Sequence, residues 1–123
     1  MKTSELSGTA LDWAVFSLER EASSWYVNDN GCFMAEEGEI SWAYQPSTDW
    51  RKGGAIIERE KLGFWWATPF TDEYGDTYGN HWYAEGVASI SEGETPLIAA
   101  MRCYVASKLG GEVEVPNELG GQR

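Results

Sequence analysis

A short basic segment, residues 44–60 (YQPSTDWRKGGAIIERE), carries residue types that could bind a small anion with an aromatic ring. These residues are Ser47, Thr48, Trp50, Arg51, Lys52, Gly53, Gly54 and Arg59. Amides at a helix start and an arginine can together hold a phosphate, because both donate hydrogen bonds to its oxygens. We predict that Thr48 and Arg59 help the two glycine amides to hold a phosphate or pyrophosphate. The alternative is an ordinary surface turn, in which glycine pairs are common.

Tryptophans provide the surface on which a base would stack. Trp50 lies in the basic segment, and Trp65 and Trp66 follow it in a predicted strand. Adjacent strand residues point to opposite faces, so either Trp65 or Trp66 must lie outside the main core. We expect that tryptophan to line a pocket or an interface. Arg102 is the last candidate for ligand contact, the alternative being a surface arginine paired with a glutamate.

No catalytic or metal-binding motif accompanies these residues. His81 is the only histidine, and the acids at positions 72, 73 and 76 lack the alternating spacing of a calcium loop. P-loop, Rossmann and GxSxG motifs are absent. We therefore predict no catalytic residues, no metal ion and no cofactor, and expect binding rather than turnover.

The charge of the chain is strongly negative, at −11. Residues 42–71 carry four basic and three acidic residues, whereas residues 1–41 carry two and eight, and residues 72–123 three and nine. Such a charge repels a phosphate backbone, so direct nucleic-acid binding is not expected. The acidity serves solubility or, alternatively, mimics nucleic acid toward a host protein. The acids would then be Glu36, Glu37, Glu39 and those of residues 72–76.

The length of 123 residues suits a single domain. No apolar stretch approaches the roughly 20 residues that cross a bilayer, and the start lacks the apolar region of a secretory signal. We therefore expect no membrane association and a cytoplasmic location. Cys32 and Cys103 have no CxxC spacing, and we expect free thiols in a reducing cytosol.

Two segments have the pattern of the main helices, residues 9–21 and 95–109. In the second, Thr95 can cap the helix, Pro96 suits its first turn, and Gly110 can end it. Strand patterns cover residues 40–44, 64–68, 81–89 and, more briefly, 112–115. Residues 23–30, 45–54 and 69–80 have loop composition, residues 55–61 favour a short helix, and residues 32–39 give only a weak signal. The fold class is a small single α+β domain, a short antiparallel sheet with two main helices, over residues 1–116 with a tail at 117–123.

Three blocks of the sequence together resemble the phage NinX-like family. They are the opening MKTSELSGTALDWAV, the central STDW with GG-x-IIERE, and TPLIAAMRCYVASKLGGEVEVPNEL near the end, covering about half of the chain. The family comprises small cytoplasmic proteins of unknown function, encoded by tailed bacteriophages and prophages. Its pattern carries proline after the double glycine, where this chain has Ala55.

The resemblance implies a phage origin and a role inside the infected bacterium, but no activity. Our first hypothesis is a binding module that sequesters a nucleotide-derived small molecule of host immunity. In this hypothesis the module acts as a homo-oligomer. The second is an acidic inhibitor that docks on a host nucleic-acid-binding protein. The third is an enzyme acting on a nucleotide, for which no nucleophile and base are legible.

Overall fold

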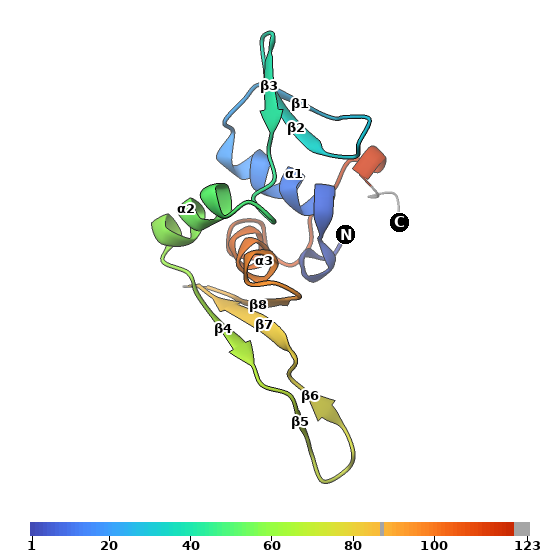
Figure 1. Ribbon diagram of the computed structural model, residues 1–123, viewed down its shortest axis with the longest axis vertical. Coiled ribbons are helices and arrows are strands. Elements are labelled where there is room, and N and C mark those ends of the chain that lie inside the picture. The colour runs from blue at the N-terminus through green and yellow to red at the C-terminus, as the bar shows by residue number, and fades with distance from the viewer. Residues whose placement is uncertain (87, 120–123) are drawn as a thin grey trace.

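The computed structural model describes residues 1–86 and 88–119, a part of the chain with three α-helices and several short strands (Figure 1). The helices are α1 (Gly8–Glu19), α2 (Trp50–Glu60) and α3 (Pro96–Leu109). The strands are β1 (Ser24–Val27), β2 (Phe33–Glu37), β3 (Ile40–Ala43), β4 (Gly63–Ala67), β5 (Phe70–Thr71), β6 (Thr77–Tyr78), β7 (His81–Glu85) and β8 (Ile90–Gly93). Two 3-10 turns are η1 (Thr3–Glu5) and η2 (Asn117–Leu119). The predicted class, a small α+β domain, is confirmed.

The strands form two small antiparallel sheets and a separate ribbon. The first sheet has the order β1-β2-β3, the second has the order β4-β7-β8, and β5 pairs with β6. Figure 1 shows the first sheet at one end of the molecule, the helices in the middle, and the second sheet below α3. The β5–β6 ribbon projects beyond the second sheet, and we call residues 68–80 the arm.

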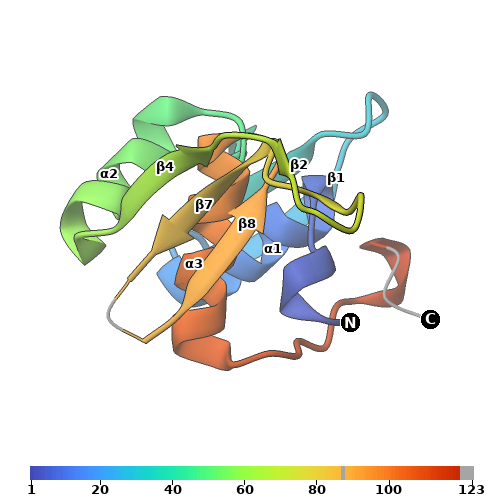
Figure 2. The same ribbon diagram turned by 90° about the horizontal axis from the view of Figure 1, so that it is seen from below.

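The core lies where α1 and α3 pack on each other and on the sheets. Leu11 and Val15 of α1, Met101 and Val105 of α3, and Phe33 of β2 are fully buried. The spacing of four places each helical pair on one face of its helix. Helix α3 covers one face of β7 and β8, as the view in Figure 2 shows, so the opposite face of the second sheet has no helix on it.

Helix α3 has the ends that its sequence predicts. The Thr95 hydroxyl oxygen accepts a hydrogen bond from the amide of Ile98 at 3.1 Å, and Pro96 begins the helix. At the other end Gly110 has φ of 87°, and its amide donates to the carbonyl of Ala106. Because a positive φ strains residues with a Cβ, glycine suits this position.

The start of α2 differs from the prediction of a loop through residue 54 and a helix from residue 55. The helix begins at Trp50, and Asp49 caps it by accepting the amide of Arg51 at 3.0 Å. A glycine inside a helix costs roughly 1 kcal/mol relative to alanine. The prediction therefore placed Gly53 and Gly54 in the loop rather than in the helix. A Cβ on Gly53 would lie 2.5 Å from both the Pro46 carbonyl oxygen and Leu97, so close packing explains the first glycine.

Several other segments also differ from the sequence prediction. The predicted loop at residues 23–30 contains β1, the weak segment 32–39 contains β2, and the predicted strand at residues 112–115 is reduced to one bridge between Lys2 and Glu112. Strand propensity depends on packing against cross-strand neighbours, so strands as short as these carry little local signal. In the predicted tail, Leu119 is buried, and residues 120–123 lie outside the described residues. No helix in the described ranges has the length and apolar character to span a membrane.

Candidate functional site

The loop before α2 is anchored to the core rather than open to a ligand. Ser47 is buried, and its amide donates to the carboxylate of Asp12 on α1 at 2.9 Å. Burial raises the pKa of Asp12 to about 6, although the hydrogen bond from Ser47 opposes that shift. The predicted ligand residue Ser47 therefore joins α1 to α2.

The glycine amides of the predicted phosphate site lie inside α2. The Gly53 amide donates to the carbonyl of Asp49 at 2.8 Å, and Gly54 follows in the same helix. Helix-internal amides are not free to bind an anion. At the start of α2, the Arg51 amide donates to the Asp49 carboxylate, and the Lys52 amide donates to the Asp49 carbonyl. The predicted geometry, in which the two glycines open a helix, is wrong because the helix begins three residues earlier.

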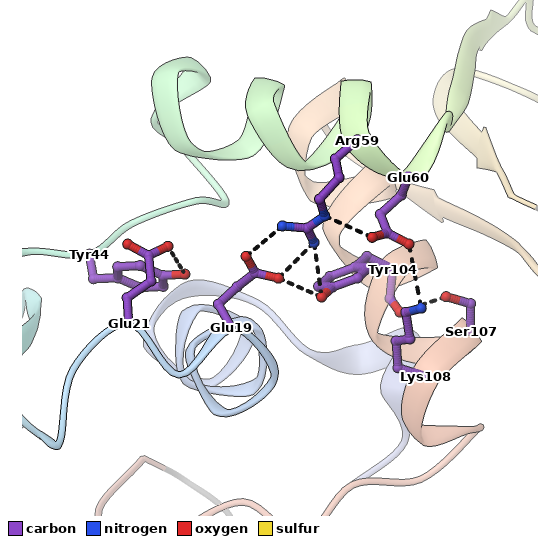
Figure 3. A network of polar contacts seen from close by, with 8 residues as sticks. All are labelled: Glu19, Glu21, Tyr44, Arg59, Glu60, Tyr104, Ser107 and Lys108. Carbon is purple, nitrogen blue, oxygen red and sulfur yellow. Dashed lines mark hydrogen bonds and ion pairs between the residues drawn. The ribbon is translucent and has the colours of Figure 1, made fainter.

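Arg59 lies at the opposite end of α2, in a network that joins three helices (Figure 3). Its two terminal nitrogens each donate to the Glu19 carboxylate at 2.8 Å, and its Nε donates to Glu60 at 2.8 Å. The same guanidinium also donates to the hydroxyl of Tyr104 on α3 at 3.1 Å, and that hydroxyl donates to Glu19. The guanidinium of Arg59 therefore already donates hydrogen bonds to three side chains of the protein.

The protonation states in this network favour a structural role. The hydrogen bond from Arg59 holds the pKa of Glu19 below its usual range. Burial, together with the contact with Glu19, raises the pKa of Tyr104 to about 12. At neutral pH the carboxylate is ionised and the phenol protonated, so neither group is poised to exchange a proton.

Arg102 occupies a different part of the molecule. Its Nε donates to the carbonyl of Leu6 at 2.7 Å, and its Nη1 donates to the carbonyl of Glu92 at 2.8 Å. Burial lowers the pKa of this guanidinium. The side chain ties the N-terminal segment and β8 to α3 and lies apart from the basic segment.

Two predicted residues, Thr48 and Arg51, do line one cleft. The cleft has a volume of about 690 Å³, and its walls are Trp42, Ala43, Gln45, Thr48, Asp49, Arg51 and Lys52. The Arg51 side chain is 93% exposed and lies 3.5 Å from Asp49. Lys52 Nζ lies 2.6 Å from Glu21. Each cation of the cleft therefore already has an acidic neighbour.

The predicted tryptophans lie at the second sheet and beside it. Trp65 and Trp66 are adjacent in β4, point to opposite faces, and are 43% and 42% exposed. Trp66 packs against Trp82 on the α3 side, whereas Trp65 stacks on Tyr83 with 5.5 Å between ring centroids. Trp50 of α2 reaches Phe64 of β4 at 6.0 Å. The sequence predicted one tryptophan outside the core, and the structure leaves both substantially exposed.

The sequence prediction missed the surface that surrounds these tryptophans. We define the aromatic–acidic surface as the exposed part of the second sheet and the arm. Its large exposed aromatic side chains are Phe64, Trp65, Trp66, Phe70, Tyr74 and Tyr78. Its acids are Asp72, Glu73, Asp76, Glu85, Glu92 and Glu94. Between Lys61 and Arg102 the chain has no lysine or arginine, and this gap was the signal that could have identified the surface.

The part of the chain that the structure describes contains no cluster of side chains suited to bind a metal ion. His81 Nε2 lies 3.3 Å from the Glu92 carboxylate across the second sheet. No three His, Cys, Asp or Glu side chains of residues 1–86 and 88–119 converge as metal ligands would. Cys32 and Cys103 are free thiols, as predicted.

Comparison with known proteins gives one result. No curated protein matches the chain. The family model described as "Bacteriophage P22, NinX" matches residues 2–108, which include α1, α2, both sheets, the arm and all of α3 except its last residue. Since that match spans most of the sequence, the chain belongs to the bacteriophage P22 NinX family.

Proposed function

We propose that this phage protein is a binding module that docks on a basic host protein, such as a nucleic-acid-binding protein, through its aromatic–acidic surface. The observation that carries the proposal is that exposed aromatic side chains and six acids occur together on the second sheet and its arm, in a stretch of chain without lysine or arginine. The module would act in the cytoplasm of the infected bacterium.

The aromatic side chains suit a protein interface. Tyrosine and tryptophan are enriched at interfaces because they offer a large contact area at a low cost in conformational entropy. On this surface Trp65 and Phe70 are 43% and 60% exposed, and Tyr74 at the arm tip is 81% exposed. Several large aromatic side chains exposed on one sheet and its arm exceed the single apolar residues that are normal on a surface, and they mark an interaction site.

The charge of the surface selects the class of partner. Six acids and no lysine or arginine lie between Lys61 and Arg102. Complementary charge speeds encounter and suppresses wrong partners, so the matching surface is rich in lysine and arginine. Basic surfaces of that kind are the ones that bind a nucleic-acid backbone, and an acidic protein docked there would compete with nucleic acid.

Affinity capture from host cells tests this proposal. The tagged protein would be incubated at low salt with nuclease-treated lysate, and captured proteins would be identified by mass spectrometry. We expect a host protein with a basic surface that is released as salt rises, because salt screens the attraction. The variant Trp65→Ser should lose that partner. The control Tyr26→Ser, a similarly exposed aromatic of the first sheet (37%), should retain it.

Two results would contradict the docking function. One is a set of captured proteins that is identical for wild type and Trp65→Ser. The other is a captured partner whose surface is acidic or whose capture does not change with salt.

A second function, sequestration of a nucleotide-derived small molecule against host defence, is favoured by one observation. The cleft of about 690 Å³ combines the Trp42 ring with Thr48 and the cations Arg51 and Lys52. An indole and two cations are the groups that a nucleotide would contact. This function ranks second because Asp49 and Glu21 already neutralise the two cations.

Mass spectrometry of released ligands tests the second function. The protein would be purified from phage-infected cells that carry a nucleotide-signalling defence, and then denatured. Sequestration predicts an intact, stoichiometric nucleotide that is lost in Arg51→Ala but retained in Trp65→Ser. A protein without bound nucleotide, purified from cells shown to make the signal, would contradict it.

A further inference from the structure

Strand β4 forms an edge of the second sheet, because β7 is its one partner among the described residues. Every second residue of an edge strand directs its amide and carbonyl away from the sheet. The sequence of β4, Gly63-Phe64-Trp65-Trp66-Ala67, contains no charge and no proline. Proteins commonly protect an edge strand with charged residues or proline. Because β4 has neither, it is open to pairing with a further strand.

The face beside this edge is also open. Trp65, Tyr83 and Glu92 lie opposite one another on β4, β7 and β8 and form a row across the sheet. A Cβ on Gly93, one residue further along β8, would contact α3, so the row with Trp65 lies on the face away from that helix. A strand added next to β4 would continue this row and place one of its side chains beside the Trp65 ring.

Charge distinguishes between the possible occupants of this edge. A second copy would bring its own acidic arm and sheet against the first, with six acids and no lysine or arginine on each side. Like charges so arranged oppose association. An extended segment with arginine or lysine has the opposite sign, and arginine in particular stacks on indole rings.

From these contacts we infer that the aromatic–acidic surface binds an extended, arginine-rich segment of its partner as an additional strand on β4. Main-chain hydrogen bonds to β4 give affinity, and alternate side chains give specificity. One arginine of the segment stacks on Trp65, toward the carboxylates of Glu85 and Glu92. This inference rests on the docking function proposed above and adds the structural form of the partner.

Calorimetric titration with synthetic peptides tests the inference. The probe is a peptide of alternating arginine and valine, about ten residues long, which exceeds the length of a typical strand. We expect saturable binding with slower hydrogen exchange at β4 amides. A peptide of the same sequence with N-methyl groups on alternate residues cannot complete the ladder and should bind at least about tenfold more weakly.

Variants of the protein locate the site. Trp65→Ser should weaken peptide binding by about tenfold, whereas Tyr26→Ser should leave it unchanged because Tyr26 lies on β1, an edge strand of the other sheet. A peptide that alternates glutamate and valine should not bind, because its charge matches that of the surface. Both variants would first be checked for native circular dichroism.

Three results would overturn strand addition. Equal affinity for the methylated and unmethylated peptides would exclude main-chain pairing. Self-association through β4, seen by sedimentation and abolished by Trp65→Ser, would make a second copy the occupant. No binding of the arginine–valine peptide, with host-protein capture still sensitive to Trp65→Ser, would leave the docking function in place and assign it to a folded basic surface.

Discussion

The basic segment of residues 44–60 and the aromatic–acidic stretch of residues 63–94 are neighbours in the chain. They differ in which of their side chains the fold buries or pairs and which it leaves exposed. In the first, polar residues that resemble a ligand site make hydrogen bonds within the protein. Arg59 donates to Glu19, and the Ser47 amide donates to Asp12. In the second, apolar residues that resemble a core are left outside it, as Trp65 and Phe70 are.

This contrast shows why residue type alone misplaces a site. Both arginines have an acidic neighbour, but Arg51 is 93% exposed and lies 3.5 Å from Asp49, whereas Arg59 is half exposed and lies 2.8 Å from Glu19. An aromatic side chain marks a core only when another element covers it, and the open face of the second sheet has no such element. Local sequence encodes neither the exposure of an arginine nor the covering of an aromatic side chain.

The largest expected effect concerns the close packing of α2. Gly53→Ala should destabilise the protein by about 3 kcal/mol, the upper part of the range for overpacking, because the new Cβ would lie 2.5 Å from the Pro46 carbonyl oxygen. Gly54→Ala is the matched control. Its Cβ would have no contact closer than 3.7 Å, so it should stabilise α2 by about 0.5–1 kcal/mol. Urea unfolding would measure both, and equal effects would show that Gly53 is not a packing position.

The next effect concerns the anchor of the basic segment to α1. The pKa of Asp12 is about 6 in the folded protein against an ordinary value of 3.8, so the folded state holds the proton more tightly. The contribution of Asp12 to the free energy of unfolding therefore decreases as pH rises from about 4 to about 6. The total decrease is on the order of 2–3 kcal/mol.

Asp12→Asn removes this titration. At neutral pH the variant should be more stable than wild type, and below about pH 4 the difference should vanish. Urea unfolding of both proteins from pH 4 to pH 7 measures the difference. A constant difference across that range would show that Asp12 does not titrate in it.

A smaller effect separates the two arginines of the basic segment. Arg59→Met should reduce the free energy of unfolding by about 1–2 kcal/mol, since Glu19 would be left largely buried without its partner. The expected loss of stability is smaller than for a buried ion pair because the Arg59 side chain is half exposed. Arg51→Met, at 93% exposure, should change stability by less than about 0.5 kcal/mol. Similar losses in thermal unfolding for the two variants would contradict the contrast.

The smallest expected effect is the loss of the arm. Replacing residues 68–80 with an Asn-Gly turn between Ala67 and His81 should change stability by no more than about 0.5 kcal/mol, because none of the residues replaced is buried and Ala67 already pairs with His81. Host-protein capture should weaken at the same time. A stability loss well above that limit would mean that the arm supports the fold, and the comparison between the two regions would fail.

The sequence predicted best where local signals act alone. The ends of α3 at Thr95 and Gly110 follow from capping, and the opposite faces of Trp65 and Trp66 follow from the pleat of a strand. It predicted less well where contacts between distant residues decide. Helix α2 contains Gly53 because the Leu97 side chain and the Pro46 carbonyl approach that position closely, and neither contact can be read from the residues around it.

By itself, the sequence determined the α+β class, the two main helices and the family, because periodicity, capping residues and blocks of similarity are local properties. Only the tertiary structure decided which charged and aromatic groups are free. Glu19, from α1, reaches Arg59 across 40 residues of chain, and α3 covers one face of the second sheet but not the other. Availability depends on those long-range contacts, which have no signature in the residues around each group.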